Sequence, residues 1–148
     1  DMALAALLSG MTLTGAGLGA VHGFAAPLGA NLPVPHGVVC GALLPHVLAA
    51  NVRALRAGPA AHDALARFAD VGRILTGQDL PDDQAADAAA RAAADLAAEL
   101  GIPPLARFGL READIPRLAA LAKKSSSMRY NPVALDDDAL AGILRAAM

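Results

Sequence analysis

The 148-residue sequence predicts an all-α, helical bundle-like domain. Alanine supplies much of the 55% hydrophobic fraction while aromatic residues make up only 3%, and alanine loses no side-chain entropy when a helix forms. The alternation of β-branched and polar residues that a sheet requires is missing. A chain of this length can bury a core without disulfides, so we expect residues 1–148 to form a single domain.

The balance of charge argues against nucleic acid as a partner. The formal net charge is -2, so no basic field would attract phosphates. The single cysteine, Cys40, excludes an internal disulfide, and its apolar surroundings predict a buried, inert thiol. We find no basic segment followed by a cleavage site, which would be the signal for export, so we expect a cytoplasmic location. The start at Asp1 indicates a processed product or part of a longer protein.

The first third of the chain carries no charge. Between Met2 and Val52 there is no Asp, Glu, Lys or Arg. Membrane-spanning helices have such compositions, but Gly29, Pro33 and Pro35 interrupt the stretch, and flanking basic residues and aromatic belts are missing. We therefore expect no membrane partner, and we expect these helices to be covered by other parts of the protein.

Residues 2–23 are predicted to form one helix or two abutting helices. Gly15, Gly19 and Gly23 recur at a spacing of four, which on a single helix would make a stripe for close approach of another backbone. The segment Pro27–Pro35 is predicted to be a rigid loop, because proline cannot donate to the helical ladder. A new helix is expected from near His36 to about Leu55.

Four further helices are predicted from apolar periodicity and end signals. The first has an apolar stripe and stops at Gly77, the second is alanine-rich and stops at Gly101, and the last two follow acidic residues, of which Asp136 is expected to be an N-cap. The stripe of the first helix consists of Leu65, Phe68, Gly72 and Leu75, and the second helix is expected from Asp82 or Asp83 to Leu100. The third carries Ile115, Leu118 and Leu121 behind Asp114, and the fourth carries Leu140, Ile143, Leu144 and Ala147 behind Asp136.

Two histidines, His22 and His36, lie in the uncharged third. They are 14 residues apart, so a shared ligand would have to be bound across a turn, which the segment 29–35 could supply. A buried histidine bonded to a backbone carbonyl is commoner than a metal ligand, so both interpretations stay open. A catalytic metal normally takes at least three protein ligands. His46 follows His36 by ten residues, about 280° around a helix, and should point away.

At these residues the chain resembles the iron-containing (group III) alcohol dehydrogenases. The likeness covers nearly the whole chain and is strongest to about Asn51 and at the tail. The similar segments are 17–30 (GLGAVHGFAAPLGA), 35–37 (PHG), 43–47 (LLPHV), 126–128 (SSM), 131–132 (NP), the acidic cap 136–138 and the helix through 143–144.

The resemblance implies the C-terminal helical half of a dehydroquinate synthase-like subunit, without the N-terminal domain that binds NAD(P). Family members hold Fe²⁺ or Zn²⁺ with one Asp and three His, of which the last two match His22 and His36. The other two ligands would precede Asp1. The implied activity is that of an alcohol dehydrogenase or aldehyde reductase acting on a small alcohol or aldehyde, in a homo-oligomer, with this chain alone inactive.

Three further positions follow from the resemblance. Phe24 could face the substrate pocket, with a core position as the alternative. Ala26 stands near the nicotinamide where many relatives have a proton-relay histidine, so water or another part of the subunit would replace that relay. Cys40 stands where relatives often have asparagine. Two alternatives stay open: a maleylacetate reductase-like enzyme of the same superfamily, and a non-catalytic helical interaction module in which His22 and His36 are structural.

Overall fold

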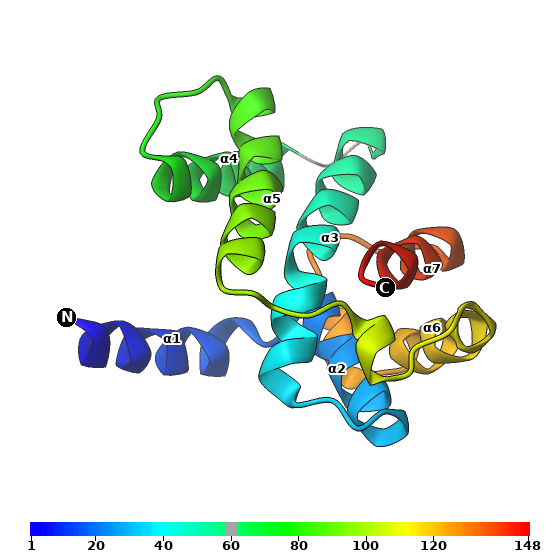
Figure 1. Cartoon of the computed structure of the whole chain (residues 1–148). Helices are drawn as coiled ribbons and strands as arrows, with labels where there is room; N and C mark the ends of the chain where they lie inside the picture. Colours follow the sequence, from blue (N-terminus) through cyan, green and yellow to red (C-terminus); the bar gives the residue numbers. More distant parts are fainter. Residues whose placement is uncertain (59–61) are drawn as a thin grey trace.

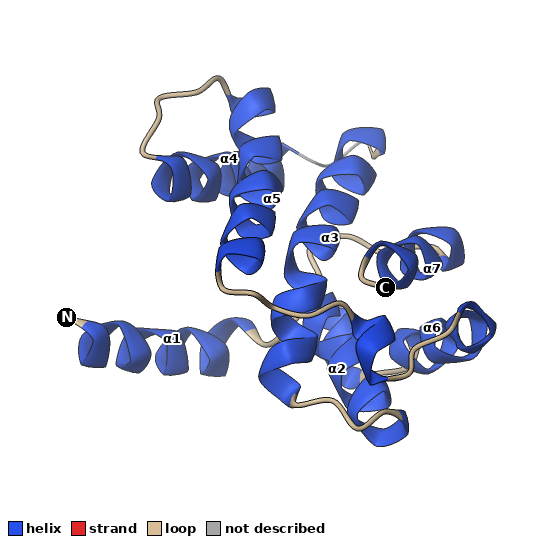
Figure 2. Cartoon of the chain, viewed as in Figure 1, coloured by secondary structure: helices blue, strands red, loops and turns tan. Residues whose placement is uncertain are grey.

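A computed structural model describes residues 1–58 and 62–148, and these residues form seven α-helices, three short 3-10 turns and no strand (Figures 1 and 2). The prediction of an all-α fold is confirmed. The helices are α1 (Met2–Ala16), α2 (Ala20–Asn31), α3 (His36–Ala57), α4 (His62–Thr76), α5 (Asp82–Glu99), α6 (Ile115–Lys123) and α7 (Asp137–Ala146). The 3-10 turns are η1 (Leu105–Phe108), η2 (Glu112–Asp114) and η3 (Ser126–Tyr130).

Helix α3 is the centre of the molecule and contacts α2, α4, α5 and α7. The main core lies where α2, α3, α6 and α7 meet, and Phe24, Leu28 and Leu43 are completely buried there. A smaller cluster lies between the far end of α3 and the pair α4 and α5. The two clusters share α3, which therefore positions the rest of the fold.

Helix α1 projects away from the body of the molecule (Figure 1). All of its residues are exposed, including Leu4, Leu7 and Leu8. Within this chain α2 and α3 are covered, whereas α1 is not, so the cover of α1 by another domain stays a prediction.

Gly17 separates α1 from α2. Its φ of +73° lies in the left-handed region that glycine adopts without strain. A Cβ at this position would lie 2.7 Å from Cγ of Tyr130, so the ring also requires glycine. The resulting break places Gly15 and Gly23 on different helices, and the predicted glycine stripe is wrong. Gly23 instead faces Met128, whose Cε lies 2.8 Å from the Cβ that glycine lacks.

The predicted loop from Pro27 to Pro35 is too long. Helix α2 continues through Pro27 to Asn31, and only residues 32–35 link it to α3. Proline removes one ladder hydrogen bond, but Phe24 and Leu28 on either side of it are completely buried in the core. Tertiary packing thus outweighs the local preference of proline.

The pair α4 and α5 packs through small residues. A Cβ on Gly72 would lie 1.8 Å from the carbonyl oxygen of Ala85, so the two backbones are in direct contact there. Leu65 and Phe68 pack on the same cluster as predicted, but Leu75 is 51% exposed and does not join it. Close approach leaves no room for a larger side chain at this crossing.

The last two helices follow the sequence closely. Asp136 caps α7, because its Oδ1 accepts a hydrogen bond of 2.7 Å from the backbone N–H of Ala139. Of the four predicted apolar residues, Leu140, Ile143 and Leu144 on α7 and Ala147 directly after it are all buried. On α6, Ile115 and Leu118 are buried, whereas the third apolar residue of the predicted pattern, Leu121, is 42% exposed.

One helix in the described residues, α3, has the length and apolar composition of a membrane span. In this fold 44% of the relevant window is buried against other elements. Helices α1 and α2 meet the same criterion only together, and they are bent by 95° at their junction.

We predict opposite effects of alanine at two helical glycines. Gly72→Ala should lower the free energy of unfolding by about 1–3 kcal/mol, because the methyl group forces α4 and α5 apart. Gly142→Ala in α7 meets open space and should raise it by about 0.5–1 kcal/mol. Urea denaturation followed by circular dichroism measures both. Equal effects at the two sites would contradict the assigned contact between α4 and α5.

Candidate metal centre

Two helices bring His22 and His36 together. His22 lies in the first turn of α2, and His36 is the first residue of α3. The short connection 32–35 reverses the chain between them, ending at Pro35 in extended conformation. The centroids of the two imidazole rings are 5.3 Å apart, with 50° between the ring planes. The two rings therefore converge, as the resemblance implies.

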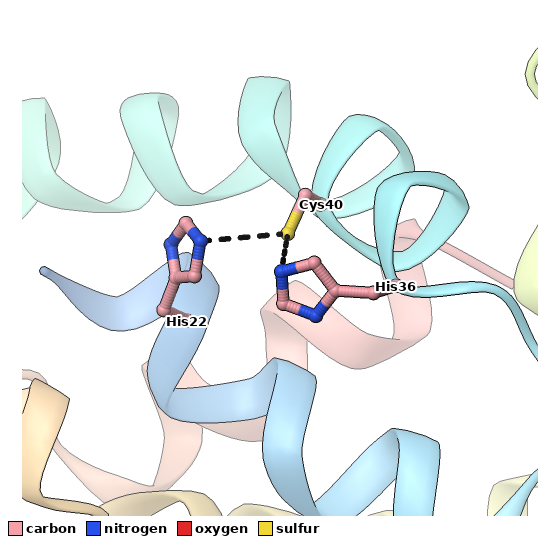
Figure 3. A group of neighbouring side chains, drawn as sticks. All are labelled: His22, His36 and Cys40. Carbon is pink, nitrogen blue, oxygen red and sulfur yellow. Dashed lines mark hydrogen bonds between the residues drawn. The ribbon is translucent and has the colours of Figure 1, made fainter. Parts of the chain in front are cut away.

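Cys40 lies between the two rings, as Figure 3 shows. Its Sγ is 3.5 Å from Nε2 of His36 and 3.9 Å from Nε2 of His22. One possible ligand atom from each of the three residues lies within 4.8 Å of the other two. The prediction of a buried Cys40 is wrong, because the residue is only half-buried and faces both histidines. The arrangement is a cluster of nitrogen and sulfur donors of the kind that binds transition metals.

The charge states of this cluster follow from its surroundings. Partial burial and then the nearby His36 lower the pKa of His22, so its ring is neutral at pH 7. Neutral imidazole is the form that binds a metal. Burial raises the pKa of the Cys40 thiol, which keeps it protonated while no cation is bound.

A pair of amide side chains fixes the start of α2. Asn131 Oδ1 accepts a hydrogen bond of 3.1 Å from the backbone N–H of Ala20, two residues before His22. Asn131 Nδ2 donates to Oδ1 of Asn51 at 2.7 Å, and Asn51 Nδ2 donates back to Asn131 Oδ1 at 3.3 Å. Asn51 lies on α3 and is 3% exposed. The pair therefore joins the N-terminus of α2 to α3 and positions His22.

A pocket of about 530 Å³ lies beside the cluster. His22 and Cys40 line it, together with Tyr130 and Asn131 from the tail of the chain. Its size falls within the range of small-molecule sites. The donor cluster thus adjoins a space in which a small ligand could lie.

Two other residues named from the resemblance take different places. Phe24 is completely buried in the main core and is not among the residues that line the pocket, so it occupies the alternative position. Ala26 is exposed on α2, one turn beyond His22. In this chain Ala26 is thus open to its surroundings, whereas Phe24 packs in the core.

His46 lies apart from the cluster, as its helical position predicted. It belongs to another pocket, lined by apolar residues of α5 and the C-terminus that include Ala94, Ala97 and Ala147. Burial lowers the pKa of His46. This histidine serves as a control for the other two.

Sequence reasoning missed Asn51 as a partner of Asn131 and Cys40 as a neighbour of the histidines. A signal for Cys40 existed, because residues four apart on a helix share a face and Cys40 follows His36 by four. No comparable local signal joins Asn51 and Asn131, which are 80 residues apart. That contact exists only in the folded chain.

Comparison with known proteins gives a consistent result. The family model for the C-terminal part of the Fe-containing alcohol dehydrogenase family matches residues 1–148. The chain is 39% identical to a 1,3-propanediol dehydrogenase of Citrobacter freundii over 99% of its own length and 36% of the relative. It is 37% identical to a lactaldehyde reductase of Escherichia coli (strain K12) over 89% of its length and 33% of the relative. The chain thus spans about a third of these relatives.

Two solved structures are similar over nearly the whole chain. A crystal structure of a 1,3-propanediol oxidoreductase aligns with a TM-score of 0.86 and 35% identity, covering 99% of this chain and 37% of the other. An alcohol dehydrogenase from Oenococcus oeni aligns with a TM-score of 0.81 and 30% identity, covering 95% and 35%. Both solved structures are therefore similar to this chain in fold and in sequence.

We predict that Asn131→Ala destabilises the protein. The change removes the acceptor for the Ala20 N–H and leaves the buried Asn51 amide without its partner, which should cost about 1–3 kcal/mol in urea denaturation. Gln78→Ala removes an exposed amide and should change stability by less than about 0.5 kcal/mol. A loss no larger than that of the control would show that the amide pair does not hold α2.

We predict that His46 makes stability fall with acidity. Its pKa is lower in the folded than in the unfolded state, so the unfolded state binds more protons as pH falls below the ordinary value of 6.5. The urea midpoint should therefore decrease between about pH 7.5 and about pH 5, and it should decrease less in His46→Gln. Equal decreases in both proteins would contradict the assigned burial of this ring.

Proposed function

The chain belongs to the iron-containing alcohol dehydrogenase family, and from this membership we propose that it is the metal-binding part of an NAD(P)-linked alcohol dehydrogenase or aldehyde reductase. The observation that carries the proposal is the convergence of His22 and His36 from two helices beside a pocket. Because the chain spans about a third of its relatives, NAD(P) and the remaining metal ligands would come from other parts of the intact subunit. On this proposal the isolated chain is inactive.

The donor atoms fit Fe²⁺ or Zn²⁺. Imidazole nitrogen suits both ions. His22 is half-buried and His36 is exposed, which leaves room for further ligands. When bound, such an ion acts as a Lewis acid that polarises an alcohol or carbonyl oxygen. His22 and His36 would hold it as neutral ligands, and the amide pair behind α2 would keep His22 in place.

The remaining residues of the chain define what surrounds the reacting group. The pocket beside His22 would accept a short alcohol or aldehyde, in keeping with the propanediol and lactaldehyde in the names of the relatives. Ala26 can neither donate nor accept a proton, so on this proposal water or a group from elsewhere in the subunit carries the proton near the nicotinamide. The apolar α1 would be covered by another part of the subunit or by a second copy in a homo-oligomer.

The names of the relatives favour this activity over a maleylacetate reductase-like reaction, because they describe oxidation of alcohols and reduction of an aldehyde. The second alternative, a non-catalytic helical module, predicts that neither histidine is needed for metal binding or turnover. A cytoplasmic location is part of the same proposal.

We predict that His22→Ala and His36→Ala each abolish metal retention in the intact subunit. Loss of a direct ligand should lower metal affinity by more than about 100-fold, and it should lower kcat/KM for NAD(P)⁺-dependent oxidation of propane-1,3-diol by as much. The reason is that mutation of residues that only contact the metal ligands already lowers affinity or activity by about 10–100-fold. Metal content by mass spectrometry and initial rates are the measurements. The matched control, His46→Ala, should retain both. Full metal and turnover in the double variant His22→Ala/His36→Ala would remove the catalytic assignment.

A further inference from the structure

We infer that Cys40 is a third metal ligand from this chain and that its sulfur biases the site toward Zn²⁺ over Fe²⁺. This inference rests on the proposed function, because it concerns the same metal. It adds a ligand beyond the two histidines and assigns it a role in the choice of ion.

The positions of the three donor atoms support a shared ion. Bonds of about 2.3 Å to sulfur and about 2.0 Å to nitrogen at a tetrahedral angle place the two donors about 3.5 Å apart. The observed separations from Sγ of Cys40 are 3.5 Å to His36 and 3.9 Å to His22. The sulfur–nitrogen separations are therefore close to those of a shared ion, and all three donor atoms lie within 4.8 Å of one another.

The helical placement of Cys40 points the same way. His36 and Cys40 are four residues apart on α3, the spacing at which two donors on one helix face can bind a single zinc ion. His22 approaches the same point from α2 (Figure 3). Three donors from two elements thus surround one position, with His36 exposed and His22 and Cys40 half-buried.

Binding of an ion changes the role of the Cys40 sulfur. Without an ion, the neutral thiol can donate its proton to one imidazole nitrogen and accept a hydrogen bond from the N–H of the other ring. A cation would satisfy the lone pairs of all three donors together. On binding, the S–H bond breaks, a sulfur–metal bond forms and one proton passes to solvent, with no change in oxidation state.

The chemical consequence is selectivity between ions. Thiolate is a soft ligand that favours zinc, whereas sites of imidazole and carboxylate also suit ferrous iron. The Cys40 sulfur should therefore shift the preference of this protein toward Zn²⁺. Replacement of the sulfur by an oxygen or amide ligand should return it toward Fe²⁺.

Cobalt spectroscopy on the intact subunit tests the ligand directly. The metal-free protein is titrated with Co²⁺, and thiolate ligation appears as a near-ultraviolet charge-transfer band beside the visible d–d bands. We expect that band in the natural protein and in the control His46→Ala, and we expect its loss in Cys40→Ser while the d–d bands remain. Circular dichroism of the metal-free proteins verifies that Cys40→Ser is folded.

Metal competition tests the selectivity. Cys40→Asn should lower the ratio of Zn²⁺ to Fe²⁺ affinity by more than about tenfold relative to the natural protein. Protection of Cys40 from alkylation by Zn²⁺, read by mass spectrometry of its peptide, gives a second measure that does not depend on enzymatic activity. An unchanged affinity ratio together with an unprotected thiol would overturn the inference.

The outcomes separate this inference from the proposed function. Bound Co²⁺ with alcohol oxidation but no charge-transfer band overturns the role of Cys40 and leaves the dehydrogenase proposal intact. A charge-transfer band that Cys40→Ser removes, without any alcohol oxidation, supports the ligand and overturns the proposed activity. No binding of Co²⁺ at all overturns both.

Discussion

The amide pair Asn51 and Asn131 is the contact on which the geometry of the candidate site depends. Asn51 is buried, where an unpaired amide is costly, and the pair joins the end of η3 to the middle of α3 and the first turn of α2. His22 follows that turn directly, while His36 and Cys40 stand on the same α3 that carries Asn51. The position of one donor relative to the other two is thus set by polar contacts between segments far apart in the sequence.

Much of the fold could be predicted from periodicity and end signals. Helices α3 and α5 begin and end within about two residues of their expected limits, and α7 begins directly after its predicted N-cap Asp136. The errors at Pro27 and in the glycine stripe share a different cause. Burial of α2 in the core lets the helix continue through Pro27, and the Tyr130 ring packs against Gly17 where α1 and α2 separate. Both outcomes depend on contacts with distant residues, so the local sequence did not predict them.

The candidate site was predicted only in part from the sequence. The pairing of His22 with His36 followed from the resemblance and not from spacing, because spacing alone favoured a structural role for each histidine. Cys40 was misjudged because composition alone suggested a buried thiol, although its position one turn after His36 placed it on the same side of α3. Phe24 lies in the core although it is close to His22 in sequence, because residues two apart on a helix point in nearly opposite directions.

The seam between α4 and α5 restricts how this part of the molecule can evolve. At Gly72 the helices touch backbone to backbone, and the neighbouring positions on α5, Ala85 and Ala89, carry side chains without rotamers. Such a seam cannot be repacked by exchanging one bulky residue for another. Substitution at this contact is confined to the smallest residues, whereas positions on the outward faces of the same two helices can accept larger side chains.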